Sequence, residues 1–310
     1  MFRGENMKAA RRTMSSTARK LEPRSISHPQ KVFWPDEGYT KLDLARFYQE
    51  IFPALQPYVA DRPLLCERCP DGMRGECFYQ REKPNGLPSG TPAKRIHHEN
   101  GYTTYVVGGE LQTQLRLVDL GCIAVHIWNS RANKPHQPDW VCFDLDPTSG
   151  EFADAARAGL QVKEGLDHLG LVSFPKTSGS RGLHLLVPIE VGPTNDEVSA
   201  FAREVARRLA TAHPHQLTVD PRLDAREGRV YIDTLRNGFA QSVVAPYSVR
   251  RRLKAPVSTP LEWSEVTPAL VPASFNISNF HTRLQHSKAW RHFFDTRQPL
   301  KAAISAVGKL

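Results

Sequence analysis

Residues 141–148 read VCFDLDPT, and this stretch constrains the fold more than any other part of the sequence. The apolar residues that precede Asp144 predict a strand running into a core. Side chains alternate between the two faces of a strand, so Asp144 and Asp146 are expected on one face and Leu145 on the other. Two adjacent carboxylates in a largely buried setting repel each other and resist desolvation, so they need a cation or a positively charged partner to remain ionised. The sequence therefore predicts a charged site at this strand.

The overall composition sets broader limits. The chain has 310 residues, of which 40% are hydrophobic, so it can form one large domain or two modest ones around a core. The sequence has no apolar run of the roughly eighteen residues that span a bilayer, and its start lacks the apolar stretch of a signal peptide. We therefore expect a cytoplasmic protein without membrane contact. An odd number of cysteines, five, argues against a disulfide framework and predicts reduced thiols.

Residues 1–25 form a basic tail. They contain seven Lys or Arg residues and two Glu, and so carry +5 of the formal net charge of +9. A basic, Ser-containing stretch of low hydrophobicity is typical of disorder. Three interpretations stay open: a solvated arm, an artefact of an upstream start with Met7 and Met14 as alternatives, or an arm that seeks nucleic-acid phosphates.

Helices and strands alternate after the tail. Thr40 is a suitable N-cap for a helix whose apolar stripe continues to Leu55, and we expect this helix to end before Pro57. An amphipathic segment covers 110–120. Patterns that predict strands lie at 62–68, 76–81, 93–98, 102–107, 122–128 and 139–145.

The segment 139–233 has the order strand, helix, strand, strand, helix, strand. Its two helices have apolar faces from Phe152 to Leu169 and from Val198 to Leu209, and the strands between them read LVSFPKT and GLHLLVPI. This order is typical of a split βαβ or ferredoxin-like plan. Residues 255–310 are richer in Pro and other helix breakers, and predict a loop followed by short helices that pack on the outside.

The stretch KTSGSRGLHL joins two of these strands. Its small residues, from Ser178 to Gly182, allow a tight turn whose backbone N–H groups can face an anion. Arg181 adds a fixed charge, and His184 lies two residues into the next strand. Alone, this stretch would be a plain hairpin turn with a core-facing histidine, but its neighbour in the predicted sheet carries the aspartate pair.

A third acidic position follows in RVYIDTLRN, where Asp233 ends a short apolar strand. With Asp144 and Asp146 it could form a cluster of three carboxylates, a ligand set that suits hard cations such as Mg²⁺ or Mn²⁺. Two such ions can stabilise both the attacking and the leaving oxygen at phosphorus. Each aspartate alone has a simpler interpretation as an N-cap or a surface turn, but a phosphate-binding turn beside the cluster favours nucleotidyl transfer.

Four motifs in this order, FDLDP, TSGSRGLHLLVP, RVYIDTLRN and VVAPYSVR, resemble the polymerase domain of bacterial ligase D, a branch of the archaeo-eukaryotic primase superfamily. The resemblance extends upstream to HPQKVFWPDEGYTKLDLARFY, RPLLCERCPDG and CFYQRE, and covers roughly residues 27–300. It implies an α+β primase-polymerase fold, with mixed or antiparallel sheets and an RRM-like or ferredoxin-like catalytic core flanked by helices. It also implies one domain over 26–310, with core motifs at 139–250 and a C-terminal helical extension at 255–310.

The resemblance also assigns site residues. Asp144, Asp146 and Asp233 match the catalytic, metal-binding aspartates of the family. Six residues match positions around the incoming nucleotide: Ser178, Arg181, His184, His126, Arg250 and Arg68. Beside Arg68, Glu67 is acidic where some relatives have Lys.

Other matches concern DNA. Lys31 and Lys41 match two lysines that clamp a downstream 5′-phosphate, as point charges suited to a terminal dianion. His28 stands where relatives carry Asn. Phe78 and Tyr79 match aromatics on which a base can stack, and the alternative for this pair is one core and one rim aromatic.

The function implied by the resemblance is template-directed nucleotidyl transfer at broken DNA ends in bacterial non-homologous end joining. It implies two Mn²⁺ or Mg²⁺ ions, nucleoside triphosphates with ribonucleotides preferred, and a gapped duplex with a 5′-phosphate. Ku and a separate or fused DNA ligase are the implied partners, with action in the cytoplasm near the nucleoid. Two other classes stay open: a metal-dependent nuclease that uses the same carboxylates, and a non-catalytic protein that binds DNA ends.

A zinc site is a further candidate, because Cys66 and Cys69 have C-x-x-C spacing and Cys77, His97 and His98 follow. The sequence has no second C-x-x-C, so we disfavour zinc.

Overall fold

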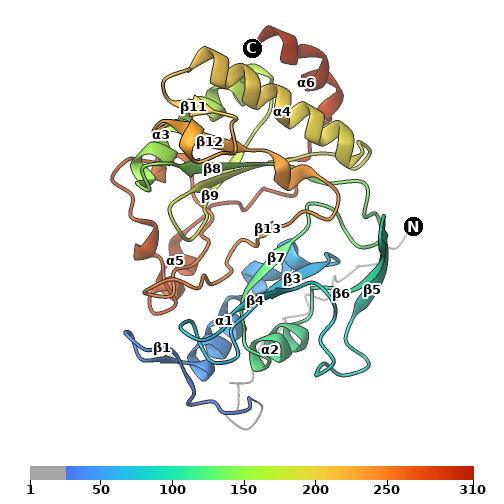
Figure 1. Cartoon of the computed structure of the whole chain (residues 1–310), viewed down its shortest axis with the longest axis vertical. Helices are drawn as coiled ribbons and strands as arrows, with labels where there is room; N and C mark the ends of the chain where they lie inside the picture. Colours follow the sequence, from blue (N-terminus) through green and yellow to red (C-terminus); the bar gives the residue numbers. More distant parts are fainter. Residues whose placement is uncertain (1–25) are drawn as a thin grey trace, which may run out of the picture.

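Two sheets face each other across the middle of the molecule in the computed structural model, which describes residues 26–310 (Figure 1). The basic tail therefore lies outside the described residues. The larger sheet has the order β11-β12-β8-β10-β9, and the smaller has the order β13-β7-β3-β4. The strands of the larger sheet are β8 (Trp140–Pro147), β9 (Phe174–Thr177), β10 (Leu183–Pro188), β11 (Leu217–Thr218) and β12 (Val230–Asp233). Those of the smaller sheet are β3 (Leu64–Arg68), β4 (Phe78–Gln80), β7 (Cys122–Ile127) and β13 (Val243–Val244).

The larger sheet confirms the predicted ferredoxin-like plan. Along the chain, β8 is followed by α3 (Phe152–His168), β9, β10, α4 (Asn195–Ala212) and β12. β10 pairs antiparallel with both β8 and β9, and β12 pairs antiparallel with β8. The short strand β11 adds to the edge, parallel to β12. Figure 1 shows α3 and α4 on the outer face of this sheet, away from the smaller sheet.

The strand β8 has the predicted alternation of side chains. Val141, Phe143 and Leu145 are buried in the core formed with α3 and α4. Cys142 and the two aspartates point to the opposite face, toward the smaller sheet, and Cys142 joins the second core there. The apolar face therefore anchors the strand, and the other face carries the carboxylates.

Helices α1 (Lys41–Val59) and α2 (Leu111–Asp119) cover the smaller sheet on its far side (Figure 1). Thr40 caps α1 as predicted, and forms a capping box with Asp43. The expected end before Pro57 is wrong, because α1 continues to Val59 with Pro53 and Pro57 inside it. Both prolines are on the exposed face, where a bend is tolerated, and burial of Tyr58 and Val59 holds the last turn.

Two hairpins complete the strands. They are β1 (Val32–Trp34) with β2 (Tyr39–Thr40), and β5 (Ala93–His98) with β6 (Gly101–Val106). The first leads directly into α1, so it places Lys31 and Lys41 near each other.

The expectation that all thiols are reduced is wrong for one pair. Cys69 and Cys77 form a disulfide, with Cα atoms 4.4 Å apart. The chain turns back between β3 and the antiparallel β4, and this reversal brings the two residues together. Cys66, Cys122 and Cys142 are buried and free.

The C-terminal segment contains the expected short helices, α5 (Phe280–His286) and α6 (Leu300–Ala306). It does not pack only on the outside, because Trp290 and Phe293 stack on each other and are buried against Trp140 of β8 and Phe174 of β9. These large aromatic side chains outweigh the local breakers. No helix within residues 26–310 has the length and apolar character to cross a membrane.

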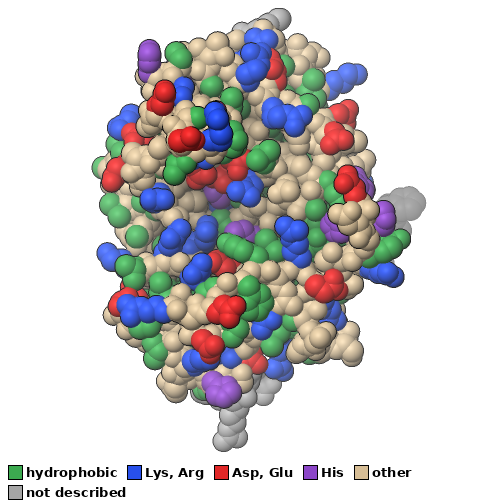
Figure 2. Space-filling model, viewed as in Figure 1, with side chains coloured by type: hydrophobic (Ala, Val, Ile, Leu, Met, Phe, Trp, Pro, Cys, Tyr) green, Lys and Arg blue, Asp and Glu red, His purple; other side chains and the backbone are tan. Residues whose placement is uncertain are grey.

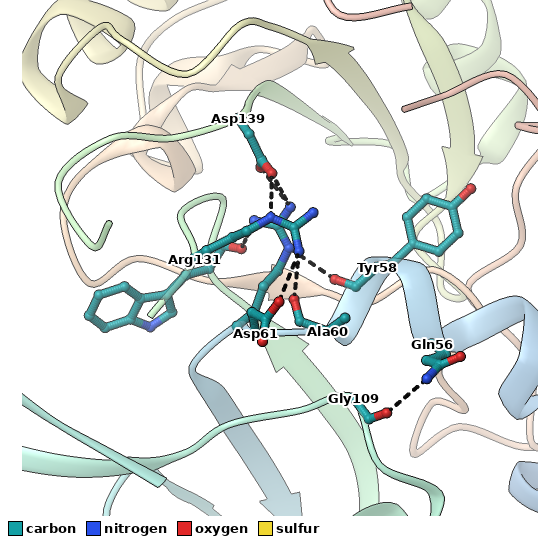
Figure 3. A network of polar contacts seen from close by, with 9 residues as sticks. Gln56, Tyr58, Ala60, Asp61, Gly109, Arg131 and Asp139 are labelled. Carbon is teal, nitrogen blue, oxygen red and sulfur yellow. Dashed lines mark hydrogen bonds and ion pairs between the residues drawn. The ribbon is translucent and has the colours of Figure 1, made fainter. Parts of the chain in front are cut away.

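A buried ionic network joins the end of α1 to the start of β8 (Figure 3). Arg62, with no exposed surface, donates from Nη2 to both carboxylate oxygens of Asp139 at 2.6 and 2.7 Å, and stacks on the Trp140 ring. Arg131 donates from Nε to the same carboxylate at 3.1 Å and from Nη1 to the Ala60 carbonyl at 2.9 Å. The network therefore fixes the base of the strand that carries Asp144.

Candidate active site

The two sheets enclose an open cavity of about 770 Å³. Figure 2 shows acidic side chains recessed near the middle of this face, with Lys and Arg side chains around them. The larger sheet and its loops contribute Asp144, Asp146, Ser178, Arg181, His184, Arg226 and Arg236. The smaller sheet and the segments around it contribute Leu65, Tyr79, His126, Val244, Arg250 and Arg252.

Sheet register brings the charged residues into one row. Asp144 lies opposite His184 on β10 and opposite Asp233 on β12, and His184 lies opposite Lys176 on β9. Directly opposed residues project to the same face, so these four side chains share the cavity side of the sheet. Asp146 lies one pair further along β8 on that face, as the sequence predicts.

Asp144 is held in its ionised form by its neighbours. Burial alone would raise its pKa, but His184 and Arg236 outweigh this effect and hold the pKa at about 2. His184 Nε2 lies 3.1 Å from Oδ1, and Arg236 Nε lies 3.6 Å from Oδ2. Burial lowers the pKa of His184 to about 4, so the ring is neutral at neutral pH.

The other two carboxylates resist ionisation. Burial and the charges of Asp144 and Asp233 raise the pKa of Asp146 to about 6. Burial, followed by the charge of Asp144, also raises the pKa of Asp233, although Arg236 opposes these effects. Arg236 Nη2 lies 3.2 Å from Asp233 Oδ2, so one guanidinium bridges Asp144 and Asp233. Arg236 is thus the positively charged partner that neighbouring buried carboxylates need in the free protein.

The donor set fits a hard divalent cation without forming a complete cage. Within residues 26–310, no group of three or more His, Cys, Asp or Glu side chains is arranged to hold a metal ion. Asp144 and Asp146 line the cavity, whereas Asp233 does not line it and is engaged by Arg236 and by the Leu235 N–H. Mg²⁺ and similar ions are commonly bound by one or two carboxylates together with substrate phosphates, and Asp144 and Asp146 can supply this part.

The turn 178–182 forms as predicted, but three of its N–H groups bond within the turn, including Ser178 N–H to the Gly182 carbonyl at 2.9 Å. Ser178 Oγ accepts hydrogen bonds from the Ser180 and Gly182 N–H groups at 3.2 and 3.1 Å. Gly179 has a φ of +71°, and a Cβ there would lie 2.5 Å from Arg250 Cγ. Arg250 Nη1 donates to the Ser178 carbonyl at 2.7 Å, which holds the turn against the neighbouring segment. Ser178, Arg181, His184 and Arg250 therefore line the same cavity.

The remaining nucleotide and base-stacking candidates divide into two groups. His126 and Tyr79 line the cavity and pack edge to face, with ring centroids 5.6 Å apart. Arg68 and Phe78 do not line it: Arg68 bonds Gln80 and the Leu120 carbonyl, and lies over the Phe78 ring. Phe78 and Tyr79 are both exposed, so neither is a core aromatic.

The two lysines matched to the 5′-phosphate clamp lie together, since the Lys41 N–H donates to the Lys31 carbonyl. Each already has an acidic partner. Lys31 pairs with exposed Asp71, and buried Lys41 donates to Asp119 at 2.9 Å and to the Ser27 carbonyl at 2.9 Å. Neither lysine lines the cavity.

Three basic residues near the carboxylates were not predicted from the sequence. Arg236 is three residues after Asp233 in a 3-10 turn, a spacing that places both on one side and could have been recognised. Arg226 lies over the Tyr231 ring and reaches the cavity from a loop whose path the sequence does not reveal. Lys176 is fully buried and donates to Ser258 Oγ at 2.6 Å, and burial lowers its pKa to about 7.

Comparisons with known proteins agree on one family. The model of the LigD primase-polymerase domain matches residues 40–290. The multifunctional non-homologous end joining protein LigD of Pseudomonas aeruginosa is 32% identical over 290 residues, which cover 90% of this chain and 34% of the relative. The bifunctional LigD of Bacillus subtilis is 29% identical over 280 residues, which cover 89% of this chain and 45% of the relative. The chain thus spans less than half of either relative.

A solved structure is similar over the same region. The polymerase domain from Mycobacterium tuberculosis ligase D, in complex with DNA, superposes with a TM-score of 0.81 and 27% sequence identity, covering 88% of this chain and 98% of that domain. The matched family model, over residues 40–290, extends over all segments that form the cavity. The chain therefore belongs to the LigD primase-polymerase family, a family of DNA-directed nucleotidyltransferases.

Proposed function

We propose that this chain extends primer 3′ ends in short gaps of broken DNA by template-directed nucleotidyl transfer. The observation that supports this most directly is the shared cavity, in which Asp144 and Asp146 face the anion-binding turn 178–182 and Arg250. A nucleoside triphosphate needs both parts, a metal-binding edge and a phosphate cradle.

The chain's own residues have distinct roles in this proposal. Asp144 and Asp146 provide oxygen ligands for Mn²⁺ or Mg²⁺, with Asp233 as the third carboxylate of the site. Bound divalent cations would supply charge neutralisation at the triphosphate and a lower pKa for the primer 3′-OH. Arg236 neutralises Asp144 and Asp233 in the free protein, so a cation must compete with this guanidinium. Neutral His184 orients Asp144.

The phosphate-binding side of the site consists of Ser178, Arg181 and Arg250. The Ser178 hydroxyl, which can still donate its proton, and the two guanidinium groups stabilise negative charge as pyrophosphate leaves. His126 and Tyr79 form the wall beside the nucleotide, where an aromatic ring can stack on a base. A preference for ribonucleotides and Mn²⁺, cooperation with Ku and a ligase, and action in the cytoplasm near the nucleoid belong to the same proposal.

The fate of a 5′-labelled primer in a 5′-phosphorylated gapped duplex tests the proposal. With Mn²⁺ and each of the four ribonucleotides, we expect the primer to lengthen by the nucleotide that the template specifies, and more efficiently than with deoxyribonucleotides. Primer shortening would indicate a nuclease. An unchanged primer with retained DNA binding would indicate an end-binding protein.

The proposed 5′-phosphate contact gives a prediction for Lys31. Lys31→Ala should reduce the preference for a phosphorylated over an unphosphorylated gap by about threefold to tenfold, because one solvent-exposed contact contributes about 0.5–1.5 kcal/mol. Asp71→Asn should increase this preference, because Asp71 competes for the same ammonium group. Lys41 is a less suitable target, because removing it leaves Asp119 unpaired in a partly buried place.

The measurement is extension on phosphorylated and unphosphorylated gaps. Arg74→Ala is the matched control. Arg74 lies on the same loop as Asp71 and pairs with exposed Asp36, so its replacement also removes one positive charge from an exposed ion pair. Equal losses on both gaps for Lys31→Ala would show that Lys31 does not recognise the phosphate.

A further inference from the structure

The turn Arg250–Lys254 reads RRRLK and leads away from the cavity. Arg250 lies inside the cavity, whereas the four residues after it are exposed. A run of basic residues is often only a solvated surface. This turn differs, because its backbone is held by the β1–β2 hairpin while part of its charge has no partner among residues 26–310.

Main-chain contacts hold the turn in place. The indole Nε1 of Trp34 donates to the Arg252 carbonyl at 2.9 Å, and the Lys254 N–H donates to Glu37 Oε1 at 2.5 Å. Lys254 and buried Ala255 have φ values of 67° and 46°, an uncommon conformation for residues other than glycine. Because these contacts use backbone atoms of the turn, its side chains remain available for a ligand.

The charges of the turn are only partly neutralised. Arg251 Nε donates to Glu67 at 2.7 Å, and the Arg250 guanidinium donates to the Ser178 carbonyl. For Arg252 and Lys254, the side chains have no ion-pair or hydrogen-bond partner among residues 26–310. Two unpaired cations are thus presented on a fixed backbone, an arrangement suited to successive phosphates.

The position of the turn indicates which phosphates it can meet. Arg252 lines the cavity and, through its carbonyl, contacts Trp34 at the end of β1, a strand that begins directly after Lys31. The turn therefore connects the nucleotide cavity to the proposed 5′-phosphate contact. DNA that occupies both places must pass this surface, and duplex DNA carries one charge per about 1.7 Å of its axis.

We propose that Arg252 and Lys254 form a phosphate-binding platform for the DNA on the downstream side of the gap. This inference rests on the proposed function and deepens it by naming the surface that holds the downstream DNA. The contacts are to the sugar–phosphate backbone and are independent of sequence.

The experiment measures binding by fluorescence anisotropy at a series of salt concentrations, with a 5′-phosphorylated gapped duplex as the probe. The logarithm of the association constant falls as log salt rises. For Arg252→Gln combined with Lys254→Gln, we expect this slope to become less steep by about 2, since each lost phosphate contact removes about 0.9. The conservative Arg252→Lys protein with Lys254 intact should keep the wild-type slope. A blunt duplex that ends at the primer 3′ end has no downstream DNA, so on this probe the double variant should have the same salt slope as the wild type.

Lys288→Gln combined with Arg291→Gln is the control, because it removes the same charge from exposed residues beside a separate cavity of about 190 Å³. An unchanged slope for the Arg252 and Lys254 double variant would overturn the platform, as would an equal fall in the control or on the blunt duplex. These binding results are scored separately from nucleotide incorporation, so a wild-type protein that binds but does not extend DNA refutes only the proposed function.

Discussion

Asp146→Asn should slow nucleotide incorporation by about 10²–10³-fold and at the same time raise the melting temperature of the metal-free protein. Ionised Asp146 is destabilising without a cation, because it is partly buried and repelled by Asp144 and Asp233, which raise its pKa to about 6. Asparagine has nearly the same shape but removes this repulsion. It also removes a metal ligand, and losing one preorganised electrostatic group typically costs about 10²–10³-fold in rate.

The pH dependence of the stability difference follows from the raised pKa. Below the ordinary value of 3.8, Asp146 is protonated in both folded and unfolded chains, so the variant and the wild type should melt alike. As pH rises from 3.8 through about 6, the wild type loses stability that the variant keeps. Above that range the variant should melt higher than the wild type by a constant amount, about 1–2 °C for each kcal/mol of relieved repulsion in a chain of this length.

Thermal melting in EDTA between pH 3.5 and 8, together with incorporation assays in Mn²⁺, measures both effects. Asp167→Asn is the control, since Asp167 is an exposed aspartate on α3 that pairs with Lys163. A variant that melts below the wild type at neutral pH would show that Asp146 stabilises the fold rather than serving the site.

Asp139→Asn should lower the free energy of unfolding by about 3–5 kcal/mol, the cost of leaving buried charges without their partner. Asp139 accepts hydrogen bonds from both Arg62 and Arg131, and Arg62 has no exposed surface. Burial lowers the pKa of Arg62 only to about 10, so this residue stays charged at neutral pH. A neutral amide cannot compensate two guanidinium groups.

Urea unfolding of Asp139→Asn and of Asp61→Asn measures this effect. Asp61 lies 3.9 Å from the same Arg131 but is exposed, so its replacement should change stability by less than about 1 kcal/mol. Equal effects of the two substitutions would mean that the buried network contributes no more than a surface ion pair.

The sequence was sufficient to predict the central part of the site because that part depends on regular strands. The period of two along β8 places Asp144 and Asp146 on one face, and the ferredoxin-like strand order makes β12 the neighbour of β8. Asp233 ends β12, so its pairing with Asp144 follows from the same pattern. The turn 178–182 is equally local, since its small residues suit only a few backbone conformations.

Other parts of the site depend on contacts between distant segments, which no local pattern encodes. The cavity exists because the β3–β7 sheet faces the β8–β10 sheet, and Arg226 enters it from an irregular loop. Lys31 and Lys41 have acidic partners on segments far along the chain, Asp71 and Asp119. The Cys69–Cys77 disulfide likewise forms because two antiparallel strands bring their connecting residues together.

The C-terminal segment shows the same limit. Its local composition predicts short surface helices, yet Trp290 and Phe293 are buried against Trp140 and Phe174 of the larger sheet. Burial of two large aromatic rings outweighs weak local propensity, and the sequence gives no sign of which sheet they meet.

The most direct test of nucleotidyl transfer at these carboxylates compares the wild type with Asp144→Ala. The measurement is incorporation of labelled ribo- and deoxyribonucleotides into a 5′-phosphorylated gapped duplex in the presence of Mn²⁺. We expect templated incorporation by the wild type and its loss in a variant that still folds and binds DNA. Incorporation by Asp144→Ala at the wild-type rate, or none by folded wild type, would contradict the assignment of this cavity as a polymerase active site.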